Sequence, residues 1–479
     1  MKGHQPLAYK DLFGMPTVTQ DRAAQSIEGS ETRLPPWSRW VGKGAVTLLD
    51  QAIVSGSSFF VSILLARMLR VAEYGAYALA ISVFLFTSSF QNALVLEPMG
   101  VLGSSLYRSK LRPYLVAVTR INVALCTGIS VLLAVVVLLY RFSTHNTVVS
   151  SALLGVSLVY AIPVLIFWLW RRAAYLQFRP GIAIRGSCVY AAIIFPSLYC
   201  FKHYNWLSPS SAFLVQGVAA AIASLVLFHS VMPASQAGGS ALSTSAVFEC
   251  HWTYGKWVAA TAVGYWLTTG AYYVFVGLFL PLERVAELRV LQNLSMPVNQ
   301  FMTAQTNLLL PLAAAQFADH GPAALRKITN LLTALFSIAA LAYLMILVLF
   351  GRRLMSLFYP ASYVHLAYLL PLSALPVVLI AAAQGTVIGL WARRLPREVF
   401  WGYSVSGVVS LPLGILLTRY AGLIGALIAL SSSAAVFLVV VLYRNRKINA
   451  AVADFSQVGN RDELTSRENV EARSNISVA

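Results

Sequence analysis

Long apolar segments alternate with short polar segments along most of the chain. Twelve apolar segments are found, near residues 45–68, 74–96, 115–140, 149–170, 182–201, 212–232, 257–279, 289–316, 328–350, 363–390, 398–418 and 421–443. A helix of about 20 apolar residues crosses a hydrocarbon core of about 30 Å. The pattern therefore predicts an all-α, polytopic integral membrane protein with about twelve transmembrane helices.

The longest interruption divides the apolar part into two similar halves. Residues 233–255 contain the stretch ASQAGGSALSTSA, which is typical of a flexible linker, and six apolar segments lie on each side of it. We expect two six-helix bundles, 43–232 and 256–445, and flexible tails at 1–42 and 446–479. Because six is even, both bundles enter the membrane in the same direction, which predicts a parallel pseudo-two-fold repeat.

A repeated tetrapeptide supports this duplication. RVAE occurs at Arg70–Glu73 and again at Arg284–Glu287, in each case between the first and second segments of a half. The position of the two copies, more than their identity, favours an internal repeat.

The distribution of positive charge predicts the orientation. The net charge is +18, and 26 of the 35 Lys and Arg residues fall on one side of the twelve-span topology. Cytoplasmic loops carry this excess, so both termini are predicted to be cytoplasmic. The same bias accounts for the net positive charge, so no nucleic-acid partner is predicted. The first forty residues lack the apolar centre of a signal peptide, so we expect the first span to remain in the protein.

Catalytic and metal-binding patterns are missing from the sequence. The four cysteines have no metal-ligand spacing, and neither HExxH, GxSxG nor a phosphate-binding GxxxxGK[ST] loop occurs. The predicted outer loops are no longer than about a dozen residues, too short for the extracytoplasmic domain of a membrane glycosyltransferase or ligase. We therefore predict a protein that is not an enzyme and binds neither metal nor cofactor.

Polar pairs recur every seven residues in the eighth segment. They are Gln292-Asn293, Asn299-Gln300 and Thr306-Asn307, and Arg289 extends the same helix face. Seven residues are almost two helical turns, so the pairs stack. A single amide can join two helices, but a continuous stripe favours the lining of a polar passage.

Carboxylates and amides also lie in the first two segments. Asp50 and Gln51 lie inside the first, and Asn92 and Glu97 lie near the end of the second. With Arg120 of the third segment, Asp50 and Glu97 are predicted at a similar depth near the cytoplasmic mouth. This group is either an ion pair that pins helices together or a gate that opens during transport.

Arginines flank the predicted outer turns of both halves. Arg67 and Arg70 end the first segment, and Arg284 and Arg289 lie in the second half. Neighbouring glutamates offer ordinary surface partners. If these arginines instead face a central cleft, their guanidinium groups suit phosphate.

The opening helix pair resembles a known family. LLDQAIVSGSSFFVSILLARML followed by AEYGAYALAISV is similar to the first helix pair of bacterial polysaccharide (O-antigen type) flippases, of the multidrug/oligosaccharidyl-lipid/polysaccharide exporter superfamily. Further similarity lies at Gln292–Asn299 and Gly422–Gly425. The resemblance covers about residues 43–445 and assigns a superfamily better than a substrate.

The resemblance implies two six-helix bundles around a central cavity lined by helices one, two, seven and eight. Such proteins carry polyprenyl-diphosphate-linked oligosaccharide from the inner to the outer leaflet of the bacterial inner membrane by alternating access. Cationic residues of the cavity are thought to contact the diphosphate. The implied partners are the bilayer, the lipid-linked saccharide, a polysaccharide polymerase and other assembly proteins.

Resemblance and amide pattern together give the candidate pathway residues Asp50, Gln51, Arg67, Asn92, Arg289, Gln292, Asn293, Asn299, Gln300 and Asn307. The candidate gate is Asp50, Glu97 and Arg120. The main alternative is a cation-coupled multidrug exporter of the same fold, which would use Asp50 and Glu97 to bind the coupling ion. A membrane glycosyltransferase or ligase is disfavoured by the short loops.

Overall fold

The computed structural model describes residues 37–104, 106–144, 146–232 and 242–476. The chain divides into two units, residues 1–45 and 46–479. The first contributes only the start of the first described helix, so the account below concerns residues 46–479.

The elements of the first half are all helical. They are α2 (Trp37–Met68), α3 (Val71–Gln91), η1 (Asn92–Leu96), α4 (Glu97–Leu102), η2 (Arg108–Lys110), α5 (Leu111–Thr144), α6 (Thr147–Leu154), η3 (Gly155–Tyr160), α7 (Ala161–Leu176), α8 (Pro180–His203) and α9 (Pro209–Val231). η1 and η3 are single wide, π-helical turns inside the second and fourth spans.

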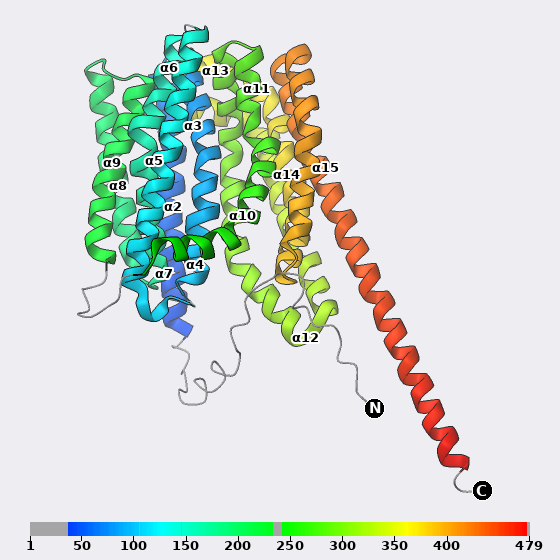
Figure 1. Cartoon of the computed structure of the whole chain (residues 1–479). Helices are drawn as coiled ribbons and strands as arrows, with labels where there is room; N and C mark the ends of the chain where they lie inside the picture. The colour runs from blue at the N-terminus through cyan, green and yellow to red at the C-terminus, as the bar shows by residue number, and fades with distance from the viewer. Residues whose placement is uncertain (1–36, 105, 145, 233–241, 477–479) are drawn as a thin grey trace. The chain divides into compact units, whose positions relative to one another are not determined.

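The second half continues in the same way. Its elements are α10 (Thr244–Thr269), α11 (Ala271–Phe279), α12 (Leu282–Phe358), α13 (Ala361–Val364), η4 (His365–Leu369), α14 (Leu370–Ala392) and α15 (Pro396–Ile476). The long ribbons of both halves are visible in Figure 1. Following the predicted topology, we call the end with the α2–α3 turn the outer end and the end with the α7–α8 turn the inner end.

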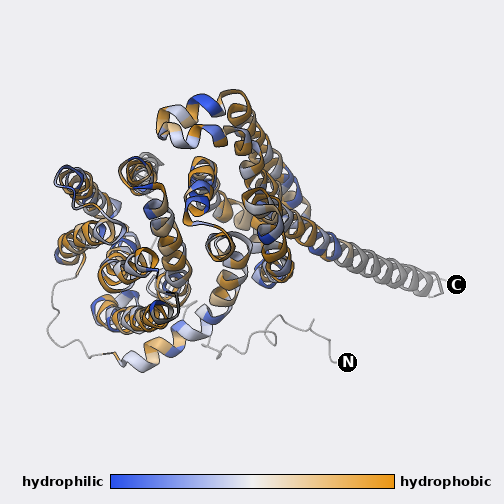
Figure 2. Ribbon diagram, turned by 90° about the horizontal axis from the view of Figure 1, so that it is seen from above, coloured by the Kyte–Doolittle hydropathy of each residue, from blue (hydrophilic) through white to orange (hydrophobic). Residues whose placement is uncertain are grey.

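The prediction of an all-α membrane protein is confirmed. Within the described residues, nine helices are long and apolar enough to cross a membrane, or ten if α10 and α11, bent by 43°, form one span. Gly422 breaks α15 with φ 61°, so that its apolar stretch covers the last two predicted spans. Gly321 breaks α12 in the same way, and the part of α12 before it contains the predicted polar eighth segment. Most of the ribbon is correspondingly apolar (Figure 2).

The predicted segment boundaries differ from the structure at three places. Residues 233–241 of the predicted linker lie outside the described residues, but α10 already begins at Thr244. α2 begins at Trp37, inside the predicted N-terminal tail, and α15 continues to Ile476, through most of the predicted C-terminal tail. Good helix formers such as Ala, Arg and Glu are frequent there, and helix propensity carries α15 beyond its apolar part.

The internal repeat stays a prediction, because the two RVAE copies take different helical positions. Arg70 precedes α3 as its N-cap, and the Glu73 carboxylate accepts a hydrogen bond from the Arg70 backbone N–H at 3.0 Å. Arg284 is already inside α12, where it forms an ion pair with Glu287 at 2.7 Å. The two RVAE copies have the same sequence, but they do not occupy the same positions relative to the start of a helix.

α10 joins the two halves near the inner end. Its first part crosses the neighbouring helices at a steep angle (Figure 1). His251 is fully buried, with one ring nitrogen 3.0 Å from the Leu94 carbonyl of η1 and the other 2.9 Å from the Tyr114 hydroxyl. One turn further, a Cβ on Gly255 would lie 2.4 Å from the Ala93 carbonyl oxygen. The wide turn of η1 thus receives both a hydrogen bond and a close backbone contact from α10.

Replacing Gly255 with alanine should destabilise the protein by about 1–3 kcal/mol, because the new methyl group cannot fit without moving α10 away from η1. We expect a lower midpoint of thermal unfolding for the purified protein in detergent. Gly128→Ala is the matched control, since nothing lies within 4 Å of a Cβ at that helical glycine. Equal unfolding temperatures for the two variants would contradict the close contact.

Candidate functional site

Asp50 forms a closed polar network inside the first half. Its carboxylate is fully buried and accepts hydrogen bonds from Arg171 at 2.6 Å, from the Tyr175 hydroxyl and from the Ser187 hydroxyl. These donors come from α7 and α8, and the Arg171 guanidinium also lies 5.6 Å from the centre of the Phe167 ring. These three hydrogen bonds join α2, α7 and α8 around Asp50.

The predicted grouping of Asp50 with Glu97 and Arg120 is not found. Glu97 instead accepts a hydrogen bond from Asn92 at 3.0 Å, and Arg120 is exposed. Among the described residues the ion pairs are Asp50–Arg171, Arg284–Glu287 and Arg444–Glu398. Several arginines share the depth of Asp50, and hydropathy cannot decide which of them the fold turns toward it.

Arg67 contacts the second half at the outer end. Its Nε donates to the Phe358 carbonyl at 2.8 Å, and its terminal nitrogen donates to the Leu357 carbonyl. These carbonyls end α12 and have no partner within the helix, and the helix dipole favours a cation there. The Phe59 and Phe358 rings lie 5.8 Å apart beside this contact. Arg67 therefore joins the end of α2 to the end of α12.

A glycine permits a second outer contact between the halves. A Cβ on Gly75 of α3 would lie only 1.9 Å from the carbonyl oxygen of Leu282, the first residue of α12. Only glycine lets the two helix starts approach this closely. The Arg67 and Gly75 contacts together define the outer contact of this structure.

Gln51 and Gln300 meet between the halves, deeper in the membrane. The Gln51 amide donates to the Gln300 carbonyl oxygen at 3.3 Å and to the Ser55 hydroxyl at 3.1 Å. Asn299, next to Gln300, is exposed. These amides are the part of the predicted stripe that faces away from the packing of the second half.

The remaining members of the stripe bind within the second half. Asn293 donates to the Tyr359 hydroxyl at 2.8 Å, and Gln292 accepts from the Tyr273 hydroxyl at 2.8 Å. Thr306 accepts from Gln384 at 2.8 Å. The Asn307 side chain lies outside the described residues. Both interpretations of the stripe therefore apply in part. Some of its amides join helices of the second half, and others face the first half.

Arg289 is a partly buried cation without a carboxylate partner in the described part of the chain. Its Nε is shielded from solvent and makes no hydrogen bond. Its guanidinium lies 6.0 Å from the centre of the Tyr273 ring and within electrostatic range of Tyr74 and Tyr77. Arg289 is the eighth residue of α12, about 10 Å below its outer end.

Tyrosines from both halves frame this cation. The Tyr74 hydroxyl is 2.8 Å from the Ser62 hydroxyl, and Tyr77 donates to Gln216 at 3.3 Å. The sequence indicated Arg289 but missed these rings, although Tyr74 and Tyr77, three residues apart, lie on one face of a helix.

A further buried polar atom, the Asn293 side-chain oxygen, lies about one turn along α12 from Arg289 and has no hydrogen-bond partner among the described residues. Buried polar groups are normally hydrogen-bonded, so an unsatisfied one marks a place where a polar ligand or water binds. We call Arg289, Asn293, Tyr273, Tyr74 and Tyr77 the arginine–tyrosine centre. It offers donors and one positive charge, and no group of His, Cys, Asp or Glu suited to a metal ion occurs among the described residues.

Asp50→Asn should lower the free energy of unfolding by about 3–5 kcal/mol, because it leaves the buried Arg171 guanidinium without its counter-charge. The second variant, Asp50→Asn with Arg171→Met, should recover part of this loss because it removes the uncompensated charge. Thermal unfolding of both proteins in detergent measures the effect. Additive losses in the double variant would rule out the pairing.

Gly75→Ala should keep the outer ends apart, because the methyl group would collide with the Leu282 carbonyl. Spin labels at cysteines replacing the exposed Arg70 and Glu283, with Cys188 and Cys200 changed to serine, should report a longer distance. Gly56→Ala is the control, since a Cβ there meets nothing within 4 Å. An unchanged distance in Gly75→Ala would refute the outer contact.

The chain was compared with known proteins. No protein-family model and no curated protein sequence matches it. Solved structures do match. An inward-facing multidrug resistance MATE family transporter of the MOP superfamily gives a TM-score of 0.72 at 11% identity, over 86% of this chain and 99% of that one.

Two other solved structures agree. The lipid II flippase MurJ in an inward closed conformation gives a TM-score of 0.60 at 12% identity, over 84% of this chain and 87% of that one. A mutant of the Vibrio cholerae MATE transporter VcmN gives 0.62 at 12% identity, over 86% of this chain and 98% of that one. The protein is therefore a multi-pass membrane protein with the fold of MOP superfamily transporters.

Proposed function

We propose that this protein is a flippase that moves polyprenyl-diphosphate-linked oligosaccharide from the inner to the outer leaflet of a bacterial inner membrane by alternating access. The observation that carries the proposal is Arg289, a cation inside the membrane part with no carboxylate partner among the described residues. A solved flippase for a lipid-linked substrate, lipid II, shares the fold.

The energetics favour an anionic cargo. An arginine at the centre of a membrane helix costs about 2.5–3.5 kcal/mol on insertion scales, which is an upper bound for Arg289 near the outer end of α12. The contact with the Tyr273 ring offsets about 0.5–2 kcal/mol of this cost, and neutral tyrosine hydroxyls do not cancel the charge. A diphosphate would supply both the counter-charge and acceptors for the guanidinium fork. The imbalance is thus explained if the partner of Arg289 belongs to the substrate.

The saccharide would use the amides that face the first half. Gln300 lies eleven residues beyond Arg289 on the same helix, about 16 Å further along its axis. Gln51, Asn299 and Gln300 can exchange hydrogen bonds with sugar hydroxyls, whose burial without partners costs several kcal/mol each. The polyprenyl tail needs no such replacement and stays in lipid.

The outer contact is the candidate gate of this proposal, in place of the Asp50–Glu97–Arg120 group. Arg67 and Gly75 hold α2 and α3 of the first half against α12 of the second. Release of the cargo to the outer leaflet requires these contacts to separate.

A cation-coupled exporter of the same fold is the second candidate. It needs a carboxylate that is free to bind the ion. Asp50 already accepts three hydrogen bonds, which leaves Glu97 and its single partner Asn92 as the feature in its favour.

Arg289→Gln should slow flipping of a polyprenyl-diphosphate-linked saccharide in proteoliposomes about ten- to hundredfold, because a charged hydrogen bond worth about 1.5–3 kcal/mol is lost. Arg289→Lys should retain part of the rate, since it keeps the charge but not the fork. Arg353→Gln, at an exposed arginine, is the control and should flip normally. Wild-type flipping by Arg289→Gln would refute the proposal. Cation-driven drug efflux that depends on Glu97, without flipping, would establish the exporter.

A further inference from the structure

A cavity of about 390 Å³ lies at the outer end of the second half, away from the arginine–tyrosine centre. Three chain segments form it: the α11–α12 turn, η4 and the break in α15. Its lining is Leu280, Arg284, His365, Leu366, Tyr368, Leu369, Ala421, Gly422, Leu423 and Ile424. The volume falls in the range of about 300–1,000 Å³ that is usual for small-molecule sites.

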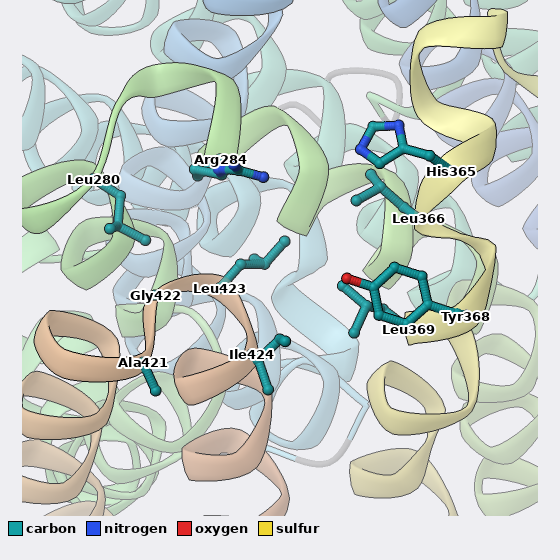
Figure 3. Close-up of a pocket in the computed structure, with 10 residues that line it drawn as sticks. All are labelled: Leu280, Arg284, His365, Leu366, Tyr368, Leu369, Ala421, Gly422, Leu423 and Ile424. Carbon is teal, nitrogen blue, oxygen red and sulfur yellow. The ribbon is translucent and has the colours of Figure 1, made fainter.

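The lining separates into an apolar body and a polar edge. Leu366, Leu369 and Leu423 are buried and supply the body. Arg284 and His365 face each other across one side of the cavity, and the Tyr368 hydroxyl points into the same space (Figure 3). Such a site suits an amphiphile with a short apolar portion and a phosphate.

Charges around the cavity moderate its positive edge without removing it. Arg284 is paired through one terminal nitrogen with Glu287 at 2.7 Å, and Glu283 precedes it on α12. Within the described chain, the Arg284 fork forms no ion pair beyond this local one, and the His365 ring is exposed. The guanidinium can therefore still donate to a phosphate oxygen.

Exposed aromatic residues place the cavity at the level of lipid headgroups. Tyr368 and Tyr420 are 69% and 79% exposed beside it. Tyr204 and Trp206, 61% and 67% exposed, occupy the corresponding outer turn between α8 and α9. Tyr and Trp concentrate at membrane–water interfaces. A phosphate at Arg284 would then lie where outer-leaflet phospholipids carry theirs.

The cavity also shares its walls with the outer contact. Leu282, whose carbonyl meets Gly75, lies between the lining residues Leu280 and Arg284. Phe358, whose carbonyl accepts from Arg67, precedes the α13–η4 wall by a few residues. An occupant that holds the α11–α12 turn against η4 would hold both anchors of the outer contact.

We propose that this cavity binds one phospholipid of the outer leaflet, with its phosphate at Arg284 and His365 and the start of an acyl chain among the leucines, and that the lipid stabilises the closed outer end. The site is separate from the cargo centre, so it stands whether or not the protein is a flippase.

The test uses the full-length protein, delipidated in detergent and titrated with phosphatidylglycerol. Native mass spectrometry should show one retained lipid, and the unfolding temperature should rise with lipid concentration, as expected for a ligand of the folded state. Ala421→Trp fills the cavity from its exposed rim and should weaken binding about tenfold or more. Ala361→Trp, exposed at the same outer level but outside the lining, is the matched control and should bind as the wild type does.

Headgroup recognition is tested by a second variant and a second lipid. The wild type should prefer phosphatidylglycerol to diacylglycerol, which lacks the phosphate, and Arg284→Gln with His365→Ala should lose that preference. Inorganic phosphate alone should not raise the unfolding temperature. Three outcomes would each overturn the proposal. They are equal lipid binding by Ala421→Trp and Ala361→Trp, an equal affinity of the wild type for the two lipids, and a full rise of the unfolding temperature with phosphate alone.

Discussion

Two glycines set how closely the halves of the protein approach each other. At the outer end Gly75 leaves room for the Leu282 carbonyl, and near the inner end Gly255 leaves room for the Ala93 carbonyl. In a bilayer the hydrophobic effect does not drive helices to associate, so close packing and hydrogen bonds between helices must hold them together. Arg289 lies between these two contacts, and its position relative to the first half is therefore fixed by backbone geometry.

The buried charges of the protein occupy two contrasting environments. Asp50 and Arg171 neutralise each other, and two hydroxyls also donate hydrogen bonds to the carboxylate. Arg289 has aromatic and neutral polar neighbours and, in the described part of the chain, no carboxylate partner. A neutralised ion pair rigidifies the bundle that contains it, whereas a charge without a counter-charge favours a ligand that can neutralise it. This contrast supports the proposal that Asp50 has a structural role and Arg289 a functional one.

The sequence predicted the helical spans well, because apolar length follows directly from membrane thickness. It also indicated Arg289 and the amides as unusual, since polar groups inside spans are costly. It could not predict the partner of Asp50, which lies 121 residues away on α7, nor the division of the amide stripe between two surfaces. Those outcomes depend on how each helix is rotated about its axis, and that rotation is set by packing between distant segments. The tyrosines were overlooked because they count as apolar in a hydropathy pattern.

The relative strengths of these contacts indicate which of them would yield in the proposed transport cycle. Breaking the buried Asp50–Arg171 pair costs about 3–5 kcal/mol, which is a large share of the stability of a domain. The Arg67 bonds are exposed and end on backbone carbonyls that water can solvate once they are released. The Gly75 contact is a steric fit with no bond to break. The outer contact is therefore cheaper to separate than the Asp50–Arg171 pair is to break, so in the proposed cycle the first half would move as a unit around Asp50.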